Sequence, residues 1–110
     1  MAAVEPLGSA DPLDPAQWLV VSGTLREADL ASLLEGTAEV AGGNVTLDLC
    51  SLQVLTTGGC WTIRNLADEL WARGRRLAVV FPETGHVGDV LRTSGTIEHP
   101  HIAFQVSLVD

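Results

Sequence analysis

Two adjacent threonines followed by two glycines stand where an apolar stretch of the sequence gives way to a helical pattern. The segment 45–59 reads V-T-L-D-L-C-S-L-Q-V-L-T-T-G-G, and the helical pattern begins at Gly58. The first N–H groups of a helix have no partner inside the helix, and they bind phosphate and other anions. Thr56 and Thr57 are therefore the candidate phosphoacceptors. The sequence predicts a regulatory site here, and enzyme chemistry is the weaker interpretation.

Trp61 is the second candidate for recognition, in this case of a protein partner. It is out of phase with the apolar stripe of the same helix, and it shares a side of that helix with Arg64. The stripe consists of Ile63, Leu66, Ala67 and Leu70. An exposed tryptophan is a typical anchor of a binding interface. The alternative is that Trp61 packs on the preceding loop or on Leu55 as a small addition to the core.

The remaining reactive side chains form no motif that indicates catalysis. Cys50 and Cys60 are ten residues apart, which fits neither a CxxC motif nor a zinc pattern. We expect two reduced, mostly buried thiols. The sequence contains no nucleophile–base pair and no dinucleotide fingerprint, and the two glycines at 58–59 lack the lysine that follows them in phosphate-binding loops. The chain is therefore predicted not to be an enzyme.

Three histidines raise the question of a metal site. They are His86, His99 and His101, and the last two form the sequence H-P-H. No cysteine or acidic residue completes a ligand set at a suitable spacing, and Pro100 makes its segment extended. We therefore expect a solvent-exposed loop, no metal and no cofactor.

The elements that position these residues follow from hydrophobic periodicity and from glycine and proline breaks. The predicted strands cover 18–22, 45–49, 76–81 and 102–106, and the predicted helices cover 28–41, 58–73 and 86–94. Because strands and helices alternate, we expect an α/β fold with right-handed crossovers. It should have a mixed sheet of four or five strands and three main helices, with Asp48 inside a strand.

Finer features of the chain complete this prediction. Residues 1–17 contain three of the five prolines, so they should form an irregular N-terminal arm or an edge strand. Residues 18–110 should form a single domain. On the helix over 58–73, opposite charges four residues apart predict the ion pairs Arg64–Asp68 and Glu69–Arg73.

Length and composition limit the classes of partner. A chain of 110 residues with 46% hydrophobic and 18% charged residues is typical of one globular domain. It contains no apolar run long enough to cross a bilayer and no leader sequence, so we expect a cytoplasmic protein with no membrane contact. The net charge of −8 repels phosphate backbones, which argues against direct binding of nucleic acid.

Four segments of the chain, taken in order, carry a family resemblance. They are G-T-L-R at 23–26, the stretch at 45–59, R-G-R-R-L-A-V-V at 73–80 and V-L-R-T-S-G at 90–95. This series resembles the STAS domain of bacterial anti-sigma factor antagonists, over about residues 18–105. The resemblance implies that residues 18–110 form a STAS-like domain.

The family pattern in the middle segment assigns roles to individual residues. The family has a strand aspartate, then five or six residues, then Asp-Ser-Ser-Gly, and a kinase phosphorylates the first serine. The resemblance places Asp48 at the strand aspartate and Thr57 at the phosphoacceptor. Thr56 falls where the family has its second aspartate, Gly58 at the second serine, and Gly59 at the glycine.

This sequence departs from the family pattern at both flanking acids. The segment from Gly23 to Arg26 resembles the family's Gly-x-Leu-Asp, but Arg26 stands in place of the aspartate. Thr56 stands in place of the other aspartate, the one before the phosphoacceptor. Arg26 can pair with a phosphate on Thr57 by a charge-assisted fork. The alternative is that Thr57 only caps the helix, as threonine often does.

The resemblance implies a function with one main alternative. An antagonist of this kind binds an anti-sigma factor, a serine/threonine kinase of the GHKL type, and releases a sigma factor; here phosphorylation at Thr57 would switch it. The expected partner surface contains Gly23, Arg26, Thr57, Gly58, Gly59, Trp61 and Arg64. The alternative, favoured by the missing acids, is a non-phosphorylated STAS subunit of a stress-signalling complex or a transport ATPase. We expect a monomer or weak dimer.

Overall fold

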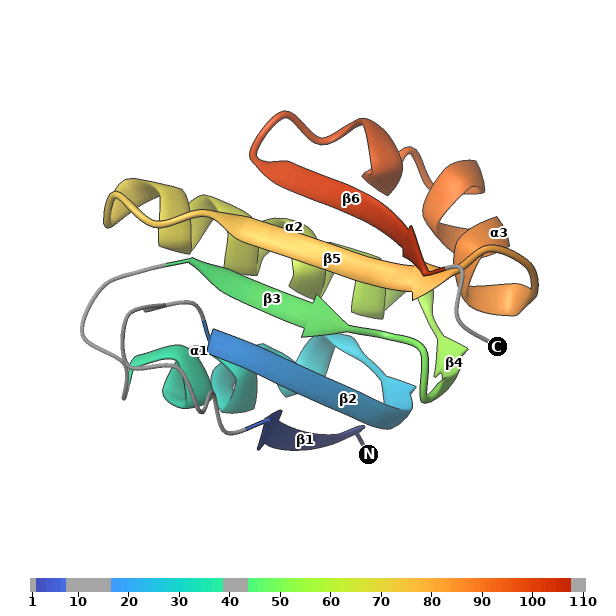
Figure 1. The fold of residues 1–110 in the computed structure, drawn as a ribbon, viewed down its shortest axis with the longest axis horizontal. Coiled ribbons are helices and arrows are strands. Elements are labelled where there is room, and N and C mark those ends of the chain that lie inside the picture. Colours follow the sequence, from blue (N-terminus) through green and yellow to red (C-terminus); the bar gives the residue numbers. More distant parts are fainter. Residues whose placement is uncertain (1, 8–16, 39–43, 108–110) are drawn as a thin grey trace.

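The structure is a computed structural model, and it describes residues 2–7, 17–38 and 44–107. Strands and helices alternate along the chain, as the periodicity predicts (Figure 1). In chain order the elements are β1 (Ala2–Leu7), β2 (Gln17–Leu25), the 3-10 helix η1 (Glu27–Asp29), α1 (Leu30–Ala38), β3 (Val45–Asp48), β4 (Leu52–Leu55), α2 (Thr57–Ala72), β5 (Leu77–Pro82), α3 (His86–Thr93), the 3-10 helix η2 (Thr96–Glu98) and β6 (Ile102–Ser107).

The strands form one mixed sheet in the order β1-β2-β3-β5-β6, and β4 joins it by pairing with β2. The edge strand β1 runs antiparallel to β2, and the other pairs are parallel. The predicted α/β fold, mixed sheet and three main helices are confirmed. The strand β4 was not predicted, because Leu52 and Leu55 face the core while the two residues between them are exposed, which is no strand-like alternation.

A bulge in β2 lets this strand pair with two partners in succession. Its first half pairs with β3, with Leu19 opposite Leu47, and its last residues pair with β4. The register shifts between Gly23 and Thr24, and Gly23 has a φ of 81°, a backbone conformation that glycine adopts readily. The bulge therefore extends β2 to Leu25, which lies beside the end of β4.

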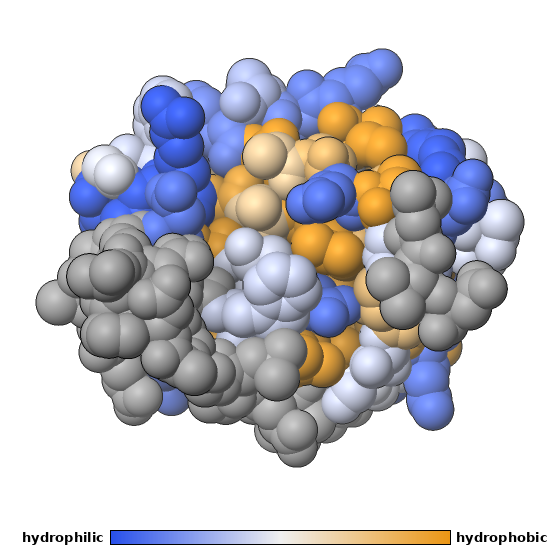
Figure 2. All heavy atoms as spheres, viewed as in Figure 1, coloured by the Kyte–Doolittle hydropathy of each residue, from blue (hydrophilic) through white to orange (hydrophobic). Residues whose placement is uncertain are grey.

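The helices lie against one face of the sheet, and the core fills the space between them (Figure 1). Alternate residues of the strands point into this core, and the predicted stripe of α2 meets them. The fully buried core residues include Leu19, Val21, Leu47, Val79, Cys60, Ile63, Leu66, Ala67 and Leu70. Figure 2 has the same view as Figure 1, in which the sheet lies in front of α1 and α2, and it shows hydrophobic side chains gathered in the middle of the visible face between hydrophilic ones.

Most predicted boundaries agree with the structure to within a few residues. Asp48 is the last residue of β3, inside a strand as expected. The helix predicted over 28–41 begins as a 3-10 turn and continues as α1 to Ala38, and residues 39–41 lie outside the described residues. Within the described part of the chain, no helix has the length and apolar character needed to cross a membrane.

Candidate functional site

Thr56 is the residue that caps α2. Its backbone is extended, and its Oγ1 accepts a hydrogen bond from the Gly59 N–H at 2.9 Å. The same hydroxyl donates to the Leu25 carbonyl oxygen, also at 2.9 Å. The alternative in which Thr57 caps the helix is therefore wrong by one residue. The Thr56 hydroxyl is engaged both as donor and as acceptor, so transfer of a phosphoryl group to it would break both bonds.

Thr57 is the first residue of α2, and it is exposed. Its hydroxyl has no hydrogen-bond partner among the described residues. It lies at the end of the helix where free N–H groups and the helix dipole favour negative charge. Of the two candidate phosphoacceptors, Thr57 is thus the one with a hydroxyl that is free to react.

The two glycines let the start of α2 lie directly on the end of β2. A Cβ atom at Gly59 would lie 2.3 Å from the Leu25 carbonyl oxygen, which is closer than any real contact. A Cβ atom at Gly58 would lie 3.0 Å from the Cβ of Glu27. Both glycines therefore serve close backbone packing, and the exposed acid Glu27 lies beside the helix start.

Arg26 joins β2 to η1, and its backbone is fixed from two sides. Its N–H donates to the carboxylate Oδ2 of the buried Asp29 at 2.8 Å. Its carbonyl oxygen accepts from the hydroxyl of Thr62, which is buried in α2, at 2.9 Å. The Arg26 side chain is exposed and forms no ion pair with the described residues. Its pairing with a phosphate on Thr57 stays a prediction.

Trp61 lies on the surface one turn after Thr57, with an exposed fraction of 40%. Its backbone carbonyl accepts from the Asn65 side chain at 2.8 Å, and Arg64 next to it is half-buried. Trp61 is absent from the buried core, which disfavours the alternative of core packing. Residues four apart lie on the same side of a helix, so Thr57 and Trp61 face the same way.

The end of α3 also contacts the start of α2, through the predicted segment at 90–95. The Ser94 hydroxyl lies 3.5 Å from the sulfur of the buried Cys60 and 2.7 Å from the Thr96 hydroxyl. At the other end of α3, His86 Nε2 accepts from the Leu55 N–H at 3.1 Å. These contacts hold α3 against the junction of β4 and α2.

Two expectations for α2 and the histidines are wrong. Asp68 does not pair with Arg64; its Oδ1 lies 3.1 Å from His99 Nε2 and 3.2 Å from His101 Nδ1. The two histidines of the expected exposed loop are half-buried, between the exposed Glu98 and Pro100, and an acid does lie beside them: the ligand atoms of Asp68, His99 and His101 are within 4.8 Å of one another. The spacing rule missed Asp68 because it lies more than 30 residues away in the sequence. The surface pair Glu69–Arg73 is present at 3.9 Å.

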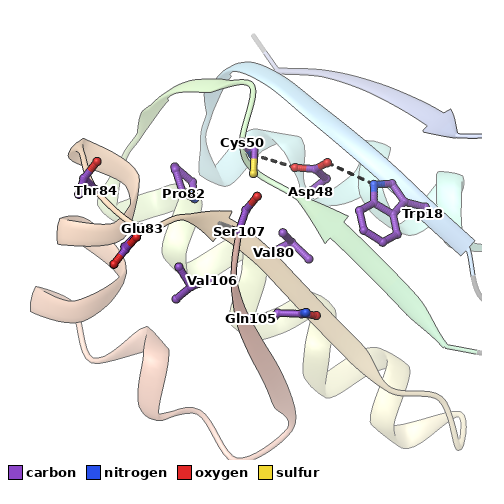
Figure 3. A pocket seen from close by; sticks show the side chains of 10 residues that line it. All are labelled: Trp18, Asp48, Cys50, Val80, Pro82, Glu83, Thr84, Gln105, Val106 and Ser107. Atoms are coloured by element: carbon purple, nitrogen blue, oxygen red, sulfur yellow. Dashed lines mark hydrogen bonds between the residues drawn. The ribbon is translucent and has the colours of Figure 1, made fainter. Parts of the chain in front are cut away.

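A cavity of about 850 Å³ lies at the carboxyl ends of β3, β5 and β6 (Figure 3), and Thr57 is not among the residues that line it. Asp48 stands on its wall, where its carboxylate accepts from the Cys50 N–H at 2.9 Å and the Trp18 indole N–H at 3.3 Å. Cys50 is exposed, so the expectation of two buried thiols holds only for Cys60. Desolvation raises the pKa of the Cys50 thiol and Asp48 adds to this rise, although Ser107 opposes it. A raised pKa disfavours the nucleophilic thiolate.

The fold is similar to that of a solved structure described as an uncharacterized protein from the DUF3478 family with a SpoIIAA-like fold, from Shewanella loihica PV-4. The TM-score is 0.55 at 18% sequence identity, and the match covers 98% of this chain and 86% of that chain. A likeness at this identity shows the fold alone, so the chain has a SpoIIAA-like fold. The sequence matches no protein-family model and no curated protein.

Proposed function

We propose that this chain is an anti-sigma factor antagonist, which binds an anti-sigma factor kinase of the GHKL type and thereby releases a sigma factor. One observation carries the proposal: Thr57 and Trp61 are both exposed on the same side of the first turns of α2. The SpoIIAA-like fold supports it. In this proposal the chain binds a partner and catalyses no reaction.

The first turns of α2 are well suited to present a binding surface. Their position is set by the Thr56 cap, by the contact of Gly59 with Leu25 and by the bond from Thr62 to Arg26. None of these contacts uses the side chain of Thr57 or Trp61. A surface that is rigid before binding loses little conformational entropy when a partner docks.

Truncation of Trp61 tests the location of the partner surface. A central interface tryptophan typically contributes about 2 kcal/mol or more, so Trp61→Ala should weaken binding of the kinase by roughly 30-fold. Trp71→Ala is the matched control, because Trp71 is 47% exposed on the same helix, near its other end. Affinity is measured by calorimetry with the purified kinase, and folding by thermal melting. Equal losses of kinase affinity in Trp61→Ala and Trp71→Ala would show that the interface is not centred on Trp61.

Phosphorylation of Thr57 is tested separately from binding. Incubation with the kinase and ATP should label Thr57, and a Thr57→Ala variant should bind normally but stay unlabelled. A phosphate adds nearly two negative charges beside Glu27, so labelled protein should bind the kinase more weakly. If Trp61→Ala loses affinity and no label appears at 56–57, the chain is a non-phosphorylated STAS subunit. The engaged hydroxyl of Thr56 and the cationic Arg26 favour that second candidate.

A further inference from the structure

We propose that Asp68, His99 and His101 form a binding site for one divalent transition-metal ion, such as Zn²⁺ or Ni²⁺. The carboxylate comes from the last turns of α2, and the two imidazoles come from the segment between η2 and β6. Their ligand atoms all lie within 4.8 Å of one another. The inference is independent of the proposed partner surface, which lies at the opposite end of α2.

The distances in this cluster are close to those of a coordination sphere. A tetrahedral zinc ion has bonds of about 2.0–2.2 Å to nitrogen and oxygen, which puts neighbouring ligand atoms about 3.3–3.5 Å apart. Asp68 Oδ1 already lies 3.1 Å from His99 Nε2 and 3.2 Å from His101 Nδ1. The two nitrogens lie within 4.8 Å of each other, so they must approach by at most about 1.5 Å to reach that spacing.

The two imidazole rings are held in place by their surroundings. The ring of His101 stacks on Trp71 with the centroids 4.3 Å apart and the planes inclined by 6°. The guanidinium of Arg76 lies over the same indole, 5.9 Å from its centroid. The side chain of His99 is only 14% exposed. Ordering these rings is a cost that the folded protein has already met, so little of it remains for the ion.

Metal binding changes the hydrogen bonds of the cluster in a defined way. Without metal, the backbone N–H of His101 donates to His99 Nδ1 at 3.1 Å, so His99 carries its proton on Nε2, which lies 3.1 Å from Asp68 Oδ1. An ion bound at Nε2 moves that proton to Nδ1, and the contact with the His101 N–H is lost. His101 Nδ1 lies 3.2 Å from the same carboxylate oxygen, which can only accept, so without metal it carries a proton there, and an ion bound at Nδ1 moves that proton to Nε2. The site therefore loses one backbone contact and the two imidazole contacts with Asp68, and it gains three metal bonds.

The ligand types select a class of ion. Two imidazole nitrogens and one carboxylate oxygen suit Zn²⁺, Ni²⁺, Co²⁺ and Cu²⁺, whereas Mg²⁺ and Ca²⁺ prefer sites built from oxygen alone. Three protein ligands leave at least one position for water, because Asp68 is 58% exposed at the edge of the cluster. A bound ion would tie the last turns of α2 to the segment before β6.

Calorimetric titration of the full, tag-free chain with Zn²⁺ and with Ni²⁺ tests the site. We expect one ion per chain, and no binding of Mg²⁺ under the same conditions. An ion at 100 times its dissociation constant should raise the melting midpoint by roughly 10 °C. Ni²⁺ should also quench the fluorescence of Trp71, because it would bind the imidazole that stacks on this indole. Trp71→Phe should lose most of the quenching and keep the stoichiometry.

Matched variants separate this site from general surface binding. His99→Gln and His101→Gln should each weaken Zn²⁺ binding by about 100-fold, since each removes one of three ligands. Asp68→Asn should weaken it by at least about 10-fold, whereas Glu69→Gln, the same change of charge one residue along α2, should leave it unchanged. His86→Gln removes a histidine outside the cluster, so it should leave Zn²⁺ binding unchanged.

The outcomes are decisive in both directions. Loss in the three ligand variants together with normal binding in Glu69→Gln and His86→Gln supports the site. Equal affinity in all variants, or no binding to the wild-type chain, overturns it and leaves a hydrogen-bonded cluster. If a histidine variant fails to melt cooperatively in EDTA, the pair Asp68→Asn and Glu69→Gln decides the question alone, because both positions are exposed.

Discussion

The two ends of α2 are attached to the rest of the domain by different means. At the start, the backbone of the helix lies on the backbone of β2, through Gly59 and the Thr56 cap. At the end, long side chains make the contacts: Asp68 reaches His99 and His101, and Trp71 stacks on His101. The start therefore leaves its outward side chains free, while the end uses them.

This difference bears on what each end can do. A helix start that is fixed through its backbone can present Thr57 and Trp61 to a partner without losing stability when they are engaged. The side chains at the other end are already bound to one another, so a ligand there must replace existing contacts. A protein interface suits the first arrangement, and a small ion that fits between three ligand atoms suits the second.

Substitution of Gly59 should have the largest effect, because it attacks the backbone contact at the start of α2. The new Cβ of Gly59→Ala would lie 2.3 Å from the Leu25 carbonyl oxygen and 2.9 Å from Leu55 Cδ1. The helix must shift, at a cost of roughly 3 kcal/mol that outweighs a gain of about 1 kcal/mol in helix propensity. Urea denaturation measures the loss.

Gly58→Ala is the control for this substitution. Its Cβ would lie 3.0 Å from the Cβ of Glu27, an exposed residue whose neighbourhood can yield. The gain in helix propensity should offset most of the cost, so stability should change by less than about 1 kcal/mol. Equal destabilisation by the two variants would show that close packing at Gly59 does not hold the helix.

Removal of the cap should have the next largest effect. Thr56→Ala loses the bond from the Gly59 N–H and the bond to the Leu25 carbonyl oxygen. We expect the free energy of unfolding to fall by about 1.5 kcal/mol, as for other threonine caps. Thr57→Ala, an exposed change, should alter it by no more than about 0.5 kcal/mol. If chemical denaturation shows a larger loss of stability for Thr57→Ala than for Thr56→Ala, Thr57 is the residue that caps the helix.

The same contrast between the two ends explains what the sequence allowed us to predict. Four strands (β2, β3, β5 and β6) and the three helices follow from local periodicity and from breaks at glycine and proline, so their positions were predicted to within a few residues, whereas β4 was missed. The start of α2 was located for the same reason. The sequence did not predict which of the two adjacent threonines caps the helix. Both have the required hydroxyl, and the extended backbone at Thr56 makes this residue the cap.

The cluster at the end of α2 was beyond local rules. The spacing of four residues predicted that Asp68 pairs with Arg64, a contact that is worth only about 0.3–0.5 kcal/mol on a helix surface. In the fold, the loop before β6 brings His99 and His101 to Asp68 across more than 30 residues. The extended segment predicted from Pro100 is wrong, because residues 100–101 form a turn in which the Ile102 N–H donates to the His99 carbonyl oxygen at 3.3 Å. No sequence signal indicated what the histidines of this turn would contact.

Truncation of His101 should have the smallest effect of the three, and it tests whether the side-chain contacts at the end of α2 contribute to folding without any metal. His101→Ala loses the stacking on Trp71 and the contact with Asp68. Stacked aromatic pairs contribute about 0.5–1.5 kcal/mol, and the contact to an exposed carboxylate adds little, so we expect a loss of about 1 kcal/mol in EDTA. A double-mutant cycle with Trp71→Ala isolates the stacking, and the coupling energy should account for most of that loss.

Since this end of α2 lies apart from Thr57 and Trp61, the affinity of His101→Ala for the kinase should stay within about twofold of the wild-type value. A coupling near zero would show that the rings merely lie side by side, and a large loss of kinase affinity would show that the two ends of the helix do not act separately.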